Sequence, residues 1–184
     1  MPAPTIAPGN VQWGFAYGWL APASEPAPLD SVAYGGDWAG NWKYIGATAD
    51  GVHRSFTRNT QDINVEEQST AVGVATTNSD YAVTWSFAEE TMANLKYAYG
   101  GGTLTTVVGP PAKVTLALSD TLDQLALGFD ALQKNGKTWR VIVPIVMSAA
   151  TVTTDYRRSE GPRIFPATFR AICAISSIIE TQFT

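Results

Sequence analysis

The sequence predicts a mainly β protein: a β-sandwich or barrel of roughly eight strands with one flanking α-helix at about 88–99. Segments rich in aromatic and β-branched residues alternate with a period of two along most of the chain, which is typical of half-buried strands. Only the stretch at about 88–99 changes to helical spacing. The pair Asn135-Gly136 lies between two apolar runs and is the strongest short hairpin signal in the chain.

Composition favours a single domain over residues 1–184, because the chain is 45% hydrophobic and no composition shift divides it. The net charge of −4 argues against a surface that grips nucleic acid phosphates, which needs clustered lysine and arginine. An acidic wall instead lets a polyanion slide without sticking. The start Met1-Pro2-Ala3-Pro4 lacks a signal-peptide pattern and no apolar run is long enough to span a bilayer, so we expect cytoplasmic synthesis and no membrane partner.

The N-terminal third combines one strand with two segments that have nothing to bury. Residues 1–10 form a Pro/Ala-rich arm, and residues 11–20 are an aromatic-rich strand. The long segment 21–37 is rich in Pro, Ala and Gly and has no pattern of its own; such connections are usually disordered or contact another chain. We therefore expect both segments to become ordered only on a neighbouring subunit. A second β region begins at Trp38 and breaks at the turn 49–51.

The next extended piece, 52–65, ends in an acidic strand. Ile63 and Val65 are expected to face the core, which places three polar side chains together on the outer face: Asp62, Asn64 and Glu66. Residues 67–80 are small and polar, as in an exposed loop or a projecting hairpin.

A strand at 81–87 then leads into the helix. Ser86 and Glu89 have the spacing of a capping box at the helix start. Glycines 100–102 end the helix. The expected apolar stripe is Ala88, Met92, Leu95 and Tyr99. Because so short a helix is unstable alone, this stripe must lie on a sheet or plug the end of a barrel.

The C-terminal half is predicted to be β. The expected strands are 103–108, 112–118, 125–132, 138–147 and 163–175, with a polar loop at 150–162 and a tail at 176–184. Alternation points Val114, Leu116 and Leu118 inward. Pro144 indicates a sheet edge or a bulge.

No catalytic motif is present in the sequence. It lacks a Gly-x-Ser-x-Gly elbow, a Walker loop and a dinucleotide-binding fingerprint. His53 and Cys173 are the only histidine and cysteine, and their spacing suggests no paired nucleophile, zinc site or internal disulfide. We therefore expect no enzyme activity, no metal and no cofactor.

Three groups of residues leave alternatives open. Asp62, Glu66 and Glu67 fit a solvated strand face, a glycosidase pair or the wall of a polar channel. The segment 156–158, Tyr-Arg-Arg, fits a salt-bridged loop or an anion contact. The tryptophans fit an aromatic core, a subunit interface or a sugar-stacking surface: Trp13, Trp19, Trp38 and Trp42.

The order of several motifs resembles the major tail tube protein of long-tailed phages. The motifs are WKYIGATADG at 42–51, DINVE at 62–66, YAVTWSF at 81–87 leading into Glu89-Glu90-Thr91, and the Asn-Gly hairpin followed by Val143-Pro144. The similarity runs from about Trp38 to Arg170. It implies a β-sandwich or barrel with a flanking helix, assembled as homohexameric rings that stack into the viral tail tube and conduct the genome. The Pro-rich arm and the segment 21–37 depart from the family pattern.

This resemblance also implies a location and partners. The protein would be made in the host cytoplasm and become part of the virion tail, with itself, the tape measure, the tail terminator and baseplate proteins as partners. DNA would pass through the lumen without specific binding. The expected channel-lining residues are Asp62, Asn64 and Glu66, and the expected inter-subunit contacts are Trp13, Trp19, Tyr34 and Trp38. The alternatives are a carbohydrate-binding β-sandwich or tail adhesin, and a secretion-system tube protein.

Overall fold

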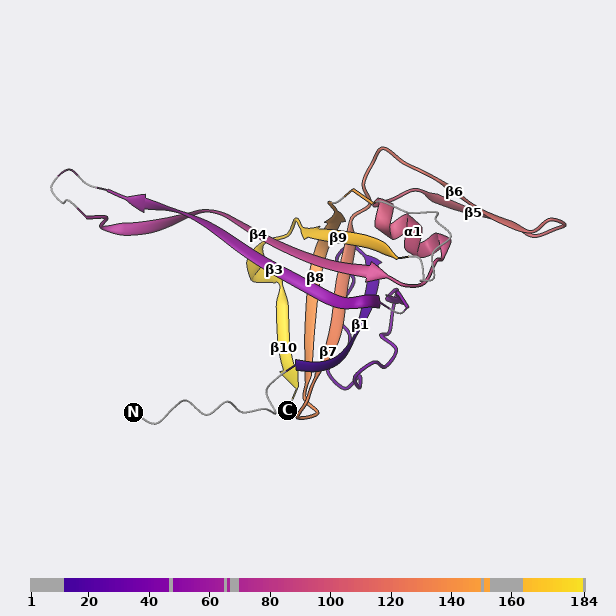
Figure 1. Cartoon of the computed structure of the whole chain (residues 1–184), viewed down its shortest axis with the longest axis horizontal. Coiled ribbons are helices and arrows are strands. Elements are labelled where there is room, and N and C mark those ends of the chain that lie inside the picture. Colours follow the sequence, from indigo (N-terminus) through magenta and orange to yellow (C-terminus); the bar gives the residue numbers. More distant parts are fainter. Residues whose placement is uncertain are drawn as a thin grey trace.

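A computed structural model describes residues 12–46, 48–64, 66, 70–149, 151–152 and 164–183. The predicted class is confirmed: the described chain has an eight-stranded antiparallel sheet, a separate two-stranded sheet and one short α-helix (Figure 1). The large sheet consists of β1 (Gln12–Pro22), β2 (Lys43–Tyr44), β3 (Thr48–Ile63), β4 (Gly73–Phe87), β7 (Leu125–Gln133), β8 (Thr138–Ser148), β9 (Phe165–Ala171) and β10 (Ile179–Phe183). The small sheet pairs β5 (Thr103–Val107) with β6 (Lys113–Ala117).

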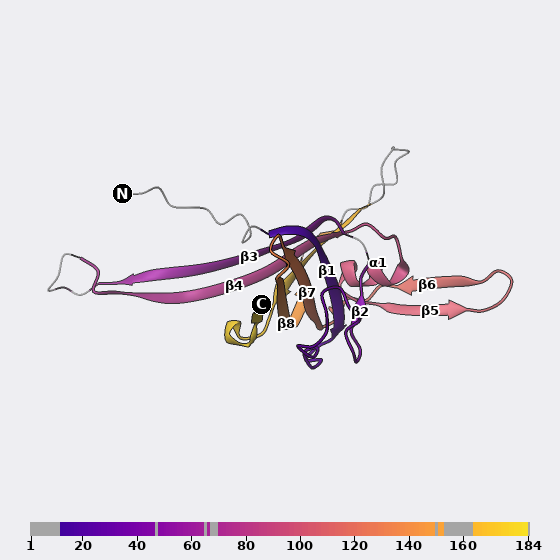
Figure 2. The ribbon, with the colours of Figure 1, turned by 90° about the horizontal axis from the view of Figure 1, so that it is seen from below.

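The large sheet bends at β8, which changes its partner along its length. Residues 138–142 of β8 pair with β10, whereas residues 146–148 pair with β9. Between these halves the register with β7 shifts, so that Leu127 pairs with Val143 and Leu125 pairs with Val146. Pro144 therefore lies at a bulge, as predicted, and bulges increase local bending. Beyond it β9, β4 and β3 cross over β8, β7 and β1 (Figures 1 and 2).

The main core lies inside this bend. The alternation predicted for 81–87 is confirmed, since Val83, Trp85 and Phe87 are fully buried while the residues between them are half-buried. Large side chains from the other strands complete the core: Leu20, Leu127, Val141, Val143, Phe165 and Phe169. Close-packed aromatic and aliphatic groups of this size dominate the burial that stabilises the fold.

A second apolar cluster lies on the opposite face of β1, β7 and β8. Its strand residues alternate with those of the main core, and two tryptophans from the connection between β1 and β2 complete it: Trp19, Ala21, Ala126 and Ile142, with Trp38 and Trp42. The segment 21–37 closes over it, and the indole N–H of Trp42 donates to the carbonyl of Pro26 at 2.9 Å. The expectation that this segment buries nothing until a neighbour binds it is therefore wrong, whereas the arm 1–10 lies outside the described residues.

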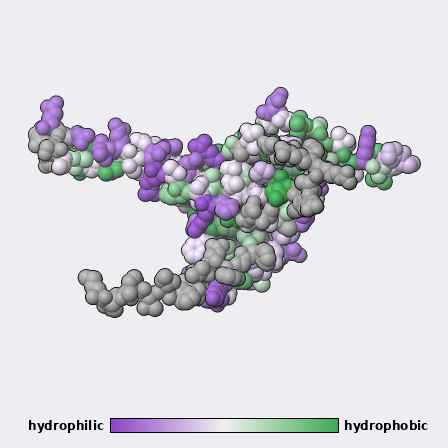
Figure 3. Space-filling model, viewed as in Figure 1, coloured by the Kyte–Doolittle hydropathy of each residue, from purple (hydrophilic) through white to green (hydrophobic). Residues whose placement is uncertain are grey.

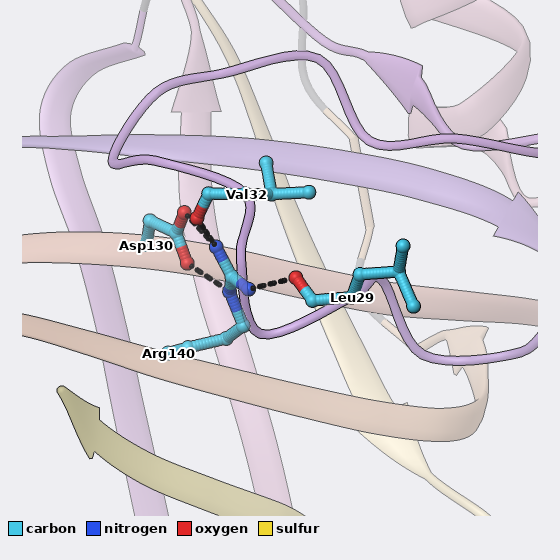
Figure 4. A network of polar contacts seen from close by, with 4 residues as sticks. All are labelled: Leu29, Val32, Asp130 and Arg140. Atoms are coloured by element: carbon cyan, nitrogen blue, oxygen red, sulfur yellow. Dashed lines mark hydrogen bonds and ion pairs between the residues drawn. The ribbon is translucent and has the colours of Figure 1, made fainter.

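Arg140 of β8 anchors this segment (Figure 4). Its guanidinium donates to both carboxylate oxygens of Asp130 on β7, at 2.8 and 2.9 Å. The remaining donors reach the carbonyls of Leu29, at 3.2 Å, and Val32, at 3.0 Å. Asp130 is completely buried and Arg140 nearly so, and such a buried charge pair is stable only when it is well hydrogen-bonded. Here each of the three guanidinium nitrogens donates at least one hydrogen bond.

Helix α1 (Met92–Tyr99) starts later than predicted. Its N-cap is Thr91, whose hydroxyl accepts from the amide of Asn94 at 3.1 Å, while Ser86 remains in β4 opposite Pro166. The predicted stripe is wrong at Met92 and Tyr99, which are exposed, whereas Leu95 packs against the main core as expected. The fully buried residues of α1 are Asn94 and Ala98. The predicted stop is correct: Gly100 has a left-handed conformation with φ of 79°.

The C-terminal residues form more structure than the predicted tail. After β9 the chain makes a short 3₁₀ turn, η2 (Ile175–Ser177), and then β10, which pairs with the first half of β8. The β7–β8 hairpin is correct as predicted, with Gly136 at φ of 82°. The predicted break at 49–51 is a register shift inside β3 instead of a turn between strands.

Candidate assembly surface

Two hairpins project from the core in opposite directions (Figures 1 and 2). The longer one is β3–β4. Strand β9 pairs only with Ala82 to Phe87 of β4, so beyond Ser55, the partner of Ala82, β3 and β4 pair with each other alone. At about 3.3 Å per residue, the stretch from Phe56 to Ile63 extends roughly 25 Å. The shorter hairpin, β5–β6, extends about 17 Å before its turn.

Both hairpins expose apolar side chains on both faces. In the long hairpin Val74 is 61% exposed, and in the short one Val108 is 94% exposed. Figure 3 shows hydrophobic residues interspersed with hydrophilic ones along both projections. The other exposed large hydrophobic residues of these hairpins are Phe56, Ile63, Val72, Leu104, Val107, Val114 and Leu118. The prediction that Val114 and Leu118 point into the core is therefore wrong.

Such ribbons are poorly stabilised by the chain itself. A two-stranded hairpin is marginally stable in water, and the outer edge of each strand offers unpaired N–H and C=O groups. In the described part of the chain the outer edge of β3 beyond Ser55 has no partner strand. The arrangement therefore suits strand addition from another chain.

The three predicted channel residues lie at the far end of β3–β4. Asp62, Asn64 and Glu66 are all exposed. The core does not set their register, because Ile63 is 47% exposed and lies opposite Gly73, on the face away from the core side chains. Pairing with β4 sets it instead. The structure describes neither Val65 nor Glu67.

The predicted contact tryptophans are partly accounted for by the second apolar cluster. Trp19 and Trp38 are 2% and 4% exposed and stack with ring centroids 4.2 Å apart. Their burial favours the aromatic-core alternative for these two residues. Trp13 belongs to β1, but its side chain lies outside what the structure describes.

Tyr34 is half-buried at the edge of the same cluster. Its ring contacts Tyr17 edge-to-face at 5.1 Å. Burial, together with a smaller effect of the nearby Tyr17 and Asp130, raises the pKa of Tyr34 to about 12.

A hollow of about 420 Å³ lies at the root of the long hairpin. Its lining residues come from β3, β4 and the C-terminal segment: Phe56, Tyr81, Ile175, Ile178 and Glu180. Glu180 forms an ion pair with Arg54, and the hydroxyl of Tyr81 donates to the same carboxylate at 3.4 Å. Sequence reasoning missed this hollow because it assigned 176–184 to a tail. The alternation of Ile179, Thr181 and Phe183 with polar residues was the available signal.

The described residues offer little for chemistry beyond packing and pairing. They contain no group of three or more His, Cys, Asp and Glu side chains placed to hold a metal ion. His53 is exposed on β3, and Cys173 is half-buried after β9. In the same part of the chain, no helix has the length and apolar character needed to cross a membrane. The polar loop with Tyr-Arg-Arg at 156–158 lies outside the described residues.

Comparison with known proteins assigns no family to this arrangement. No protein-family model matches the chain, and no curated protein matches it. The function is therefore inferred from the hairpins, the hollow and the motifs of the sequence.

Proposed function

We propose that this chain is a structural virion protein that self-assembles into stacked six-membered rings and forms the tail tube of a long-tailed phage. The observation that carries the proposal is the pair of oppositely directed hairpins, whose strands have open edges and exposed apolar side chains. The number of subunits per ring and the stacking come from the resemblance to tail tube proteins. Tape measure, tail terminator and baseplate proteins are the further partners that this proposal entails.

The physical argument is that the free subunit leaves its hairpins incomplete. The root of β4 pairs with β9 and its inward side chains are buried, but Val74 to Asn78 are exposed on both faces of the ribbon. Burying apolar surface favours association, and edge pairing adds directional hydrogen bonds. A closed symmetric assembly removes such open edges, whereas a monomer keeps them.

The charge of the long hairpin suits a wall along which DNA passes. Residues 57–79 carry three carboxylates, Asp62, Glu66 and Glu67, and one arginine. Repeated around a ring, they would form an acidic belt that acts on DNA within a Debye length of roughly 8 Å at physiological salt. In the proposed tube Asp62, Asn64 and Glu66 face the lumen.

The carbohydrate-binding alternative needs exposed aromatic rings on which sugars can stack. Trp19, Trp38 and Trp42 are buried in this chain, so three of the four tryptophans that suggested that alternative are not exposed for stacking. A secretion-system tube protein would assemble through similar surfaces. Mass spectrometry of purified phage particles distinguishes a tail tube protein from a secretion-system tube protein, because only the tail tube protein is a major component of the virion.

The decisive experiment is to follow assembly of the purified protein. Light scattering over a concentration series, with electron microscopy of the same samples, should show rings or tubes. A strictly monomeric protein at high concentration under several salt conditions would refute the proposal.

A truncated variant tests the role of the long hairpin. In this variant a two-residue Asn-Gly turn replaces residues 57–80 and connects Phe56 to Tyr81, its register partner in β4. We expect near-UV circular dichroism to be retained and assembly to be lost. The matched control shortens only the connection between Ile63 and Gly73, and it should still assemble.

A further inference from the structure

The hollow at the root of the long hairpin is built to receive an apolar group. Its two polar lining residues already contact one another, since the hydroxyl of Tyr81 donates to the carboxylate of Glu180. The same carboxylate forms an ion pair with the neighbouring Arg54. Phe56, which is 48% exposed, provides an apolar wall together with the two isoleucines of the C-terminal segment, Ile175 and Ile178. An uncharged hydrophobic side chain could therefore enter without breaking an existing polar contact or leaving a charge unpaired.

The tip of the short hairpin is a matching projection. Val108 is 94% exposed, a larger fraction than for any other large hydrophobic residue in the described part of the chain. It follows β5 and begins the turn Val108-Gly109-Pro110-Pro111, which carries no charge. Two adjacent prolines restrict the backbone, so little conformational freedom is lost when this tip is held by a partner.

We propose that the β5–β6 tip of one copy inserts Val108 into the Phe56–Glu180 hollow of the next copy. This inference rests on the proposed function as an assembling subunit. In both ribbon views β5–β6 points away from β3–β4, and β10 lies on the far side of the core (Figures 1 and 2). A tip therefore cannot fill the hollow of its own chain. The contact joins two different surfaces and is head-to-tail, the type that builds rings or filaments.

Charge and length agree with this docking. Residues 103–117 carry one lysine, Lys113, and no carboxylate, whereas residues 57–79 carry three carboxylates and one arginine. A basic hairpin thus lies along an acidic one, and complementary charge favours the correct encounter. The roughly 25 Å overhang of β3–β4 also accommodates the roughly 17 Å of β5–β6 beside it.

Cysteine cross-linking tests the contact directly. In a Cys173→Ser background, we would prepare Val108→Cys, Ile178→Cys and the double variant, and expose each assembled sample to a mild thiol oxidant. The double variant should give a ladder of covalent oligomers, because each chain then carries both halves of a head-to-tail contact. Each single variant alone should remain uncross-linked, and a mixture of the two should stop at dimers.

Other outcomes overturn the proposal. Dimers of Val108→Cys alone would indicate a tip-to-tip contact instead. Rings or tubes in electron microscopy without cross-linking in the mixture would refute this contact while leaving the proposed function intact. If the unmodified protein never assembles, the proposed function fails together with the contact.

A second readout uses variants that the fold tolerates. Val108→Asp changes an almost fully exposed residue and should leave thermal stability unchanged. It should raise the concentration needed for assembly by roughly tenfold or more, because a carboxylate replaces a buried valine beside Glu180. Leu29→Asp is the matched control, since Leu29 is 71% exposed and its side chain belongs to neither surface. Equal effects of the two variants would contradict the inference.

Discussion

The two halves of β4 differ in burial and in the strands that pair with them. From Tyr81 to Phe87 every second residue is buried, and β9 pairs along this half. From Val74 to Asn78 every residue is exposed, and the only pairing strand is β3. The same strand thus belongs to a folded core at one end and to an unsupported ribbon at the other.

This difference shows that period-two alternation in the sequence does not predict whether one face of a strand is buried within the same chain. From Tyr81 to Phe87 the alternation does correspond to burial in the core of the subunit. In the distal half apolar side chains such as Val74 are mostly exposed. Proteins manage exposed strand edges of this kind by pairing or covering them. The comparison therefore separates residues that stabilise the subunit from residues that would contact other subunits in the proposed assembly.

The largest expected effect is at Arg140, far from the ribbon. Arg140→Ala leaves the fully buried carboxylate of Asp130 without its partner, so we expect a loss of about 3–5 kcal/mol in the free energy of unfolding. Urea denaturation monitored by tryptophan fluorescence would measure it. The matched control is Arg170→Ala, whose exposed pair with Asp80 at 2.5 Å should contribute under about 1 kcal/mol. Equal losses of unfolding free energy in the two variants would contradict the conclusion that the Arg140–Asp130 pair is buried and the Arg170–Asp80 pair is exposed.

The same substitution on both halves of β4 sharpens the comparison. Val83→Ala removes two methyl groups from a fully buried site and should cost about 1.5–3 kcal/mol of unfolding free energy. Val74→Ala should change it by less than about 0.5 kcal/mol. Assembly should show the reverse order, with Val74→Ala weakening polymer formation. A Val74→Ala variant that unfolds more easily than Val83→Ala would break the comparison.

A smaller effect is expected at alkaline pH from Tyr34. Its pKa is raised from 10.0 to about 12 in the folded chain, so above pH 10 the unfolded state releases the phenol proton before the folded state does. This contribution to stability is complete below pH 10 and is lost as the pH rises towards 12. Thermal melts should show a shallower decline for Tyr34→Phe. An identical decline in both proteins would contradict the assignment; part of it remains in both, because burial also raises the pKa of Tyr81 and Tyr97.

The smallest effect on folding is expected at the hairpin end. The double variant Asp62→Lys with Glu66→Lys changes exposed charges and should alter the unfolding free energy by under about 0.5 kcal/mol. Genome ejection from assembled virions should slow, because lysines attract DNA phosphates, and the delay should shrink at high salt. Ejection at the normal rate and salt dependence would show that these residues do not line the lumen.

Local signals in the sequence predicted several elements well. Gly100 ends α1 and Gly136 turns the β7–β8 hairpin because both need positive φ, which is a property of the local chain. The β class and the buried face of 81–87 follow from alternation in the same way. The helix start was wrong because Ser86 and Thr91 are both acceptable caps, and pairing of Ser86 with β9 decides between them.

Long-range contacts account for what could not be predicted. The carbonyls of Leu29 and Val32 are held by Arg140, which lies 111 and 108 residues later in the chain. No pattern within 21–37 signals that contact. The hollow at Phe56 likewise needs β10 beside β4, and its neighbours come together only in the finished sheet.

The order of strands in the large sheet has a consequence for the speed of folding. β3–β4 and β5–β6 join neighbouring segments, so each hairpin can form on the microsecond timescale. The large sheet also needs pairings between distant segments: Gln12 of β1 lies opposite Gln133 of β7, and Ala82 of β4 lies opposite Arg170 of β9. Such non-local closure is slow, of the order of milliseconds to seconds. We therefore expect a newly made chain to expose both hairpins before its core is complete, and in the proposed assembly subunits could misassociate during that interval.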